Sequence, residues 1–163
     1  MNVQVQNEII IRAPLENIFQ TTANLLLWPR VLPHYRWVRI LEKGDDGSLV
    51  QMAAWRGWLP IQWTSRFKVD SAARELHFQH LKAFTRGMKV KWTYTPAEHG
   101  VIVRISHELN RWYAGLIARY FIHPVASRTL AGFKEYLERG DCRTSPSLNT
   151  GRMALSNQRV TNS

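Results

Sequence analysis

The sequence predicts an α+β fold in which a curved, seven-stranded antiparallel sheet wraps around one long C-terminal helix, with two short helices after the first strand. Apolar and polar residues alternate with period two in six successive segments between residues 36 and 110, as in strands with one buried face. Residues 110–140 instead carry apolar side chains at three-and-four spacing, which predicts a helix of roughly 40 Å. Because such a helix needs a large apolar partner, we expect the sheet to curve around it.

The N-terminal part of the chain predicts one strand and two short helical pieces. Apolar residues of segment 3–11 alternate with polar ones, which is typical of a strand. Pro14 follows where a helix can begin, since the first turn needs no N–H there. Segment 25–35 is apolar but contains Pro29 and Pro33, so it can hold only a short helix or turns.

The middle of the chain predicts six antiparallel strands joined by short turns. The sequence Gly-Asp-Asp-Gly at 44–47 is typical of a tight hairpin. A second turn is expected at 57–60. The predicted strands cover residues 36–42, 49–55, 61–70, 76–80, 88–95 and 101–110.

The long C-terminal helix has recognisable end signals. Asn110 is a suitable N-cap, and Gly140 is a suitable stop because glycine adopts the left-handed C′ conformation without strain. Pro124 removes one backbone hydrogen bond, so we expect a kink near His123. Residues 1–140 are therefore predicted to form one ligand-binding domain, and 141–163, rich in polar residues, a disordered tail.

Charge and composition restrict the partners. The 163 residues carry a formal charge of +10 with a pI near 10.4, which favours an anionic membrane surface or an acidic acyl carrier protein, although a basic chain can also be merely soluble. No nucleic-acid-binding motif is visible, so nucleic acid is not expected. Neither a signal peptide nor a long apolar run is present, and Cys142 is the single cysteine. These features predict a cytoplasmic protein, peripheral to the membrane if associated with it, without metal or cofactor.

The turns of the predicted sheet differ between its two ends. The turns at 43–48, 70–74 and 96–100 are polar and partly acidic. The opposite end combines large apolar side chains with Lys and Arg, which suits a cavity mouth or a membrane contact. The alternative is that these side chains fold back into the core. The residues are Trp58, Leu59, Phe84, Trp112 and Tyr113.

The inner face of the sheet predicts a cavity with few polar groups. Ser65 and His107 lie among large aromatic residues, and such a surface can leave room for a hydrophobic ligand. The alternative is a filled core in which His107 is a hydrogen-bonded structural residue. As a general base, His107 would need a substrate proton within about 3 Å. His77 and His80 should face opposite sides of their strand, so they do not form a metal-binding pair.

The order of elements resembles the START-like (SRPBCC) helix-grip superfamily. The segments 11–19, Trp28-Pro29 and Leu32-Pro33-His34-Tyr35 look like its N-terminal signature. The steps 63–65 (Trp-Thr-Ser) and 88–94 (Met-Lys-Val-Lys-Trp-Thr-Tyr) are similar to those of single-domain aromatic polyketide aromatase/cyclases. The Leu-Pro step also resembles coenzyme-Q-binding START proteins. The residues expected at the ligand are Trp28, Leu32, Tyr35, Trp63, Ser65, Phe67, Met88, Trp92 and His107.

The resemblance implies two functions. A binding protein would hold an aromatic polyketide, a quinone or a lipid in the cavity. An aromatase/cyclase would fold a carrier-bound poly-β-keto chain, and Tyr35, Ser65 and His107 would be the candidate catalytic residues. In the aromatase/cyclases an inward arginine two residues past the serine serves the cyclisation, whereas this chain has Phe67 there. This difference favours binding, with cyclisation as the alternative.

Overall fold

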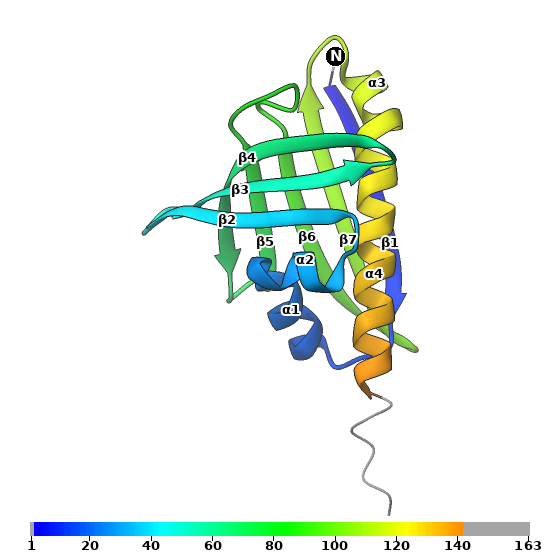
Figure 1. Cartoon of the computed structure of the whole chain (residues 1–163). Helices are drawn as coiled ribbons and strands as arrows, with labels where there is room; N and C mark the ends of the chain where they lie inside the picture. The colour runs from blue at the N-terminus through cyan, green and yellow to red at the C-terminus, as the bar shows by residue number, and fades with distance from the viewer. Residues whose placement is uncertain (1, 142–163) are drawn as a thin grey trace, which may run out of the picture.

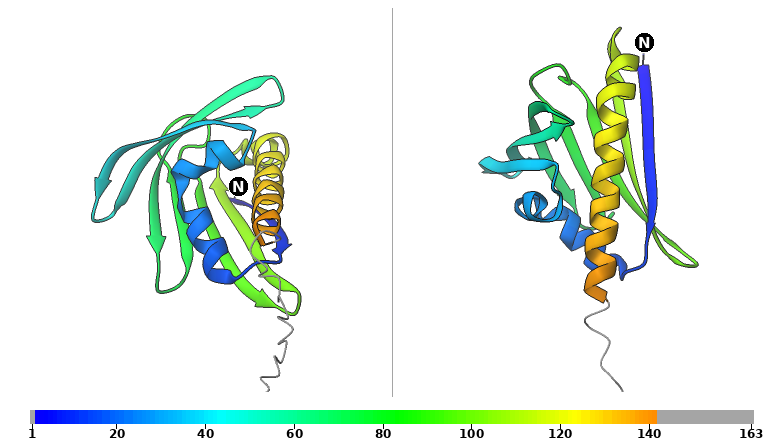
Figure 2. Two further views of the ribbon diagram at one scale, coloured as in Figure 1. Left: turned by 60° about the horizontal axis from the view of Figure 1, so that its bottom comes forward. Right: turned by 45° about the vertical axis from the view of Figure 1, so that its right-hand side comes forward.

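The computed structural model describes residues 2–141, and all but the first residue of the predicted tail lies outside that range. One antiparallel sheet has the strand order β1-β7-β6-β5-β4-β3-β2 and curves around a long helix (Figures 1 and 2). The strands are β1 (Asn2–Ile11), β2 (Tyr35–Gly44), β3 (Gly47–Arg56), β4 (Leu59–Asp70), β5 (Glu75–His80), β6 (Lys89–Ala97) and β7 (Gly100–Asn110). The helices are α1 (Leu15–Ala23), a 3₁₀ turn (Leu25–Leu27), α2 (Trp28–Val31), α3 (Ala114–Ile117), a π-helical turn (Ala118–Ile122) and α4 (His123–Asp141).

The predicted fold class is confirmed, because all seven strands, the two short helices and the long helix are present. The hairpin at 44–47 is also confirmed, with Gly44 paired to Gly47. In the described part of the chain, no helix is long and apolar enough to cross a membrane.

Both predicted end signals of the long helix are wrong. Asn110 is the last residue of β7 and pairs with Asn2, because β1 begins early enough to extend β7 to that point. The helix therefore begins at Ala114, after Tyr113, which makes no side-chain capping hydrogen bond. Gly140 lies inside α4, which continues to Asp141.

The irregularity expected near His123 is a π-helical turn directly before that residue. Pro124 has no N–H to donate to the carbonyl of Tyr120, four residues earlier. The guanidinium of Arg56 supplies a replacement, because its Nε donates to that carbonyl oxygen at 2.6 Å. A residue at the end of β3 thus satisfies the backbone group that the proline leaves open.

Trp28 is the centre of the core between helix and sheet. Its side chain is 2% exposed, and its indole Nε1 donates to the carbonyl of Thr22 at 3.0 Å. The ring contacts four other aromatic rings at centroid distances of 5.2 to 6.0 Å. These rings come from β2, β5, β6 and α4, so one side chain joins the N-terminal segment to both layers. They belong to Tyr35, Phe78, Trp92 and Phe133.

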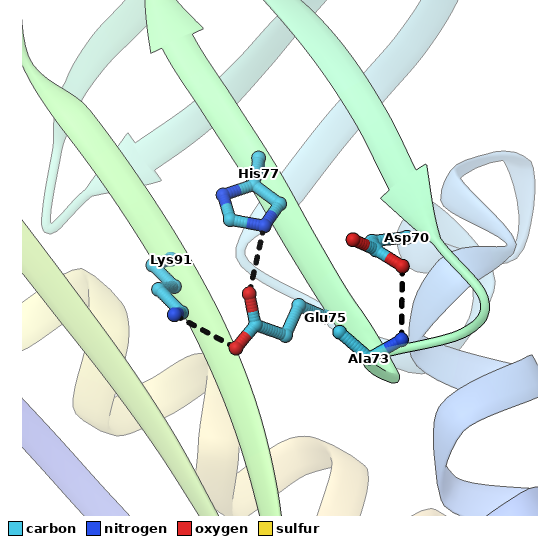
Figure 3. A network of polar contacts seen from close by, with 5 residues as sticks. All are labelled: Asp70, Ala73, Glu75, His77 and Lys91. Carbon is cyan, nitrogen blue, oxygen red and sulfur yellow. Dashed lines mark hydrogen bonds and ion pairs between the residues drawn. The ribbon is translucent and has the colours of Figure 1, made fainter.

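The outer face of the sheet is polar (Figure 3). Glu75 accepts from Lys91 Nζ at 2.7 Å and contacts His77 Nε2 at 3.0 Å. His77 lies on this face and His80 is buried on the inner face, so the two face opposite sides of their strand as predicted. These two histidines therefore cannot share a ligand.

Replacing Trp28 with alanine should lower the free energy of unfolding by about 3–5 kcal/mol, because the change leaves a large cavity between four rings. Urea unfolding followed by circular dichroism measures this loss. Trp58→Ala is the matched control, since Trp58 is 88% exposed and should change stability by less than about 0.5 kcal/mol. Equal losses in the two variants would contradict the central role of Trp28.

Candidate ligand cavity

A cavity of about 90 Å³ lies between the sheet and the long helix. Inward-facing residues of β4, β5, β6 and β7 form one wall, and the first half of the long helix forms the other. Tyr35 and Trp28 contribute from the N-terminal segment. On the sheet side the main lining residues are Trp63, Phe78, His80, Met88, Trp92 and His107, and on the helix side Phe121, Ile122, Val125, Ala126 and Thr129.

Few polar groups reach this mainly aromatic cavity. The ring of His80 stacks parallel to Trp63, with centroids 6.0 Å apart, and its Nδ1 lies 2.7 Å from the hydroxyl of Thr85. The hydroxyl of Thr129 donates to the carbonyl of Val125 at 2.8 Å. Nδ1 of His80 and the hydroxyls of Thr85 and Thr129 are therefore hydrogen-bonded within the protein.

His107 differs from the other polar lining residues. Its Nδ1 is buried and has no hydrogen-bond partner among the described residues. A buried polar atom without a partner costs about 1–3 kcal/mol, so a group that bonded it would gain that free energy. His107 is therefore the position at which the cavity can recognise a polar atom of a ligand.

The histidines of this region are neutral near neutral pH. Burial lowers the pKa of His80 to about 4. Burial, together with the smaller effects of the nearby His80 and His123, lowers the pKa of His107 to about 3. Burial raises the pKa of the Tyr35 phenol well above its ordinary value. The hydrogen bond with Thr129 acts in the opposite direction and is the smaller effect. Tyr35, His80 and His107 therefore bring no charge to the cavity near neutral pH, which suits an uncharged ligand.

Two phenylalanines lie together at the edge of the cavity. Phe84, from the β5–β6 loop, lies against Phe121 of the π-helical turn, with ring centroids 5.1 Å apart, and both line the cavity. Pockets for drug-sized ligands usually measure roughly 300–1,000 Å³. A larger ligand therefore requires movement of this pair, and Phe84 is the more mobile candidate because it lies on a loop and is 37% exposed.

Comparison with known proteins is consistent with this architecture. A family model described as polyketide cyclase/dehydrase and lipid transport matches residues 2–138. The chain belongs to this family. Among curated proteins, a Streptomyces halstedii protein described as a polyketide cyclase is 27% identical over 105 residues, which cover 61% of this chain and 94% of the relative.

Solved structures of the START-like superfamily share the fold of this family member. The Zhui aromatase/cyclase from Streptomyces sp. R1128 superposes with a TM-score of 0.71 at 20% identity, covering 85% of this chain and 95% of that one. A START superfamily protein from Mycobacterium smegmatis gives 0.70 at 10% identity, covering 83% and 97%. At such identities the likeness concerns the fold alone.

Six of the nine residues predicted at the ligand line the cavity: Trp28, Tyr35, Trp63, Met88, Trp92 and His107. The other three are buried behind its wall. Leu32 packs against Gly132, where an added methyl group would lie 2.6 Å from its Cδ2. Phe67 packs on Phe78 at 4.7 Å, and Ser65 is fully buried with no hydrogen-bond partner for Oγ within residues 2–141.

The residues predicted at the mouth divide into two groups. Phe84 lines the cavity, Tyr113 donates its hydroxyl to the carbonyl of Phe84 at 3.3 Å, and Trp112 packs on Tyr113 at 5.3 Å. Trp58 and Leu59 lie instead on the β3–β4 turn. Trp58 borders a separate groove beside α4, because the twist of the sheet carries this turn past the cavity.

The sequence did not predict the contribution of the long helix or of His80. The helix residues follow from its apolar stripe only once its position against the sheet is known. His80 continues the buried alternation of Leu76 and Phe78 along β5, so strand parity could have identified it as an inward residue.

Lowering the pH from about 7.5 to about 5 should destabilise the protein, with His80 contributing about 1–2 kcal/mol. Unfolded His80 titrates near 6.5 and folded His80 near 4, so the unfolded state gains protons first as the pH falls. Stability from this group is complete above 6.5 and is lost toward 4. The free energy of unfolding, measured with urea across this pH range, should depend less steeply on pH in His80→Gln than in the wild type.

His99→Gln is the control for this pH experiment, because its side chain is 73% exposed. It should leave the slope of stability against pH unchanged. If His80→Gln kept the wild-type slope of stability against pH, the conclusion that buried His80 is neutral would be wrong.

Proposed function

We propose that this protein binds an uncharged aromatic small molecule in the cavity and does not convert it. The observation that carries the proposal is the buried, unpartnered Nδ1 of His107 in a lining that is otherwise mostly apolar. A ligand with one hydroxyl or carbonyl group would bond this nitrogen, and its rings would occupy the apolar space.

The aromatic lining indicates the shape of the ligand. Trp63, Phe78 and Trp92 border the cavity, and ring-on-ring contacts contribute about 0.5–1.5 kcal/mol each beyond buried area. An aromatic polyketide or a quinone offers flat rings and a polar oxygen. A lipid with a straight acyl chain offers no flat ring, so it fits less well.

The chemistry of the lining favours binding over catalysis. An effective general base has a pKa near the working pH, whereas burial lowers that of His107 to about 3. Phe67 stands where the aromatase/cyclases have an inward arginine, and the adjacent Arg66 is on the exposed face. The lining therefore lacks a cation that could stabilise an enolate.

The alternative is an aromatase/cyclase acting on a carrier-bound poly-β-keto chain. The curated relative described as a polyketide cyclase favours it. Tyr35 and His107 would then orient the chain, whereas Ser65 lies behind the wall. Native mass spectrometry of the freshly purified protein separates the two: an intact co-purified aromatic molecule supports binding, and turnover of an offered poly-β-keto analogue supports the alternative.

His107→Leu should remove the preference for a hydroxylated ligand. Wild-type protein should bind 1-naphthol about 3- to 10-fold more tightly than naphthalene, because one hydrogen bond contributes about 0.5–1.5 kcal/mol. In His107→Leu this ratio should approach one while naphthalene still binds. Quenching of tryptophan fluorescence measures both dissociation constants.

His77→Leu is the matched control, since it replaces a histidine on the outer face of the sheet. It should retain the wild-type ratio. An unchanged ratio in His107→Leu would show that Nδ1 does not recognise the hydroxyl.

Phe84→Ala should raise the association rate of 1-naphthol several-fold, because it removes one ring of the pair at the edge of the cavity. Stopped-flow tryptophan fluorescence measures the rate. Leu26→Ala, an exposed apolar substitution outside the cavity lining, is the control. If both variants kept the wild-type rate, the ligand would enter elsewhere.

A further inference from the structure

Four large apolar side chains protrude into solvent on the β3–β4 turn and around the start of the long helix. Trp58 is 88% exposed, Trp112 85%, Leu116 63% and Tyr120 50%. They lie on segments 56–60 and 111–120, which together with segment 82–86 we call the aromatic–basic end. Side chains so exposed bury almost nothing within the protein, so their apolar surface is available to a partner.

Hydrogen bonds join the three segments to one another. Arg56, before the β3–β4 turn, donates to the carbonyl of Tyr120 at 2.6 Å. The β5–β6 loop meets the start of the helix through Phe84, which accepts from the hydroxyl of Tyr113 at 3.3 Å. Arg111 donates to the carbonyl of Arg86 at 3.5 Å. The exposed side chains therefore face a common partner rather than three separate ones.

The aromatic–basic end carries cations and no carboxylate. Its three segments contain five basic residues and neither Asp nor Glu. Within residues 2–141, none of the five forms an ion pair with a carboxylate. Their charges are thus free for an anionic partner. The five are Arg56, Lys82, Arg86, Arg111 and Arg119.

We propose that the aromatic–basic end docks on the surface of an anionic lipid bilayer. Trp and Tyr favour the membrane–water interface, and basic residues beside them bind anionic headgroups. An acidic acyl carrier protein would also attract the cations. However, Trp58 and Trp112 are almost fully exposed, and a fluid bilayer accommodates such side chains without shape complementarity.

Docking in this orientation places the cavity opening against the lipid. Phe84 and Phe121 line the cavity and lie within or beside the same surface. A hydrophobic ligand could then pass between bilayer and cavity without crossing water, where its apolar surface costs free energy. Docking itself requires no ligand, so the proposal stands independently of the proposed binding function.

Co-sedimentation with vesicles tests the proposal. The full chain should bind vesicles of phosphatidylcholine containing phosphatidylglycerol, bind vesicles of phosphatidylcholine alone far more weakly, and dissociate as salt is raised. Arg111→Gln with Arg119→Gln should weaken binding roughly 30-fold, since each basic residue near an anionic surface contributes about fivefold. Trp58→Ala with Trp112→Ala should also reduce the fraction of protein bound to vesicles, including the fraction that stays bound at high salt.

Matched controls separate this surface from general basicity. Arg66→Gln with Lys68→Gln removes the same charge from the outer face of the sheet, and Tyr136→Ala removes an aromatic ring, 47% exposed, near the opposite end of α4. Both should retain wild-type binding. Equal losses in the charge control would overturn the proposal in favour of non-specific attraction.

Two further outcomes would also overturn it. One is absence of binding to anionic vesicles at low salt. The other is binding of an acidic acyl carrier protein through the same residues without vesicle binding. Binding of 1-naphthol in solution, measured on the same preparations, stays unchanged if only docking is wrong, so failure of docking and failure of the cavity are distinguishable.

Discussion

The structure depends on burying the apolar stripe of the long helix in the concave face of one sheet. Phe133 is fully buried, and Leu130 and Leu137 beside it are 2% and 8% exposed. The stripe could not be covered by a flat sheet, so the curvature of the strands and the position of the helix are consequences of the same requirement. Trp28 fills the space that the first crossover leaves between these layers, which explains why α2 is short and why its tryptophan contacts four rings.

The cavity exists where this packing is incomplete. Leu130, Phe133 and Leu137 fill the second half of the helix–sheet interface, whereas the first half presents the smaller Val125, Ala126 and Thr129 to the opposing tryptophans. The π-helical turn and Pro124 lie at the same level. A widened turn and small side chains keep the helix from filling this part of the sheet, and the space that results is bordered by aromatic rings and by neutral histidines.

The same region of the molecule combines an apolar interior with a basic exterior. His80 and His107 are neutral because they are buried, while the arginines of the aromatic–basic end, a few residues away along the chain, stay in water. The inner side of this region is therefore complementary to an uncharged ligand, and its outer side is complementary to an anionic surface. The family to which the chain belongs is described by both polyketide cyclase/dehydrase activity and lipid transport.

The sequence by itself determined the strands, the helix and the chemical character of each end. Alternation at 61–70 and three-and-four spacing after residue 114 are local properties of the sequence. They predict strands and helices correctly because each element must bury one face, whichever element it packs against. Of the six expected residues that line the cavity, Trp63, Met88, Trp92 and His107 followed from strand parity, and Trp28 and Tyr35 from the family resemblance. Tertiary structure decided the rest: β1 extended β7 to Asn110, twist carried Trp58 to a separate groove, and α4 covered Leu32. These outcomes depend on which segments of the chain pack against each other. Alternation along one strand shows which of its side chains are buried, but it does not show which segment covers them.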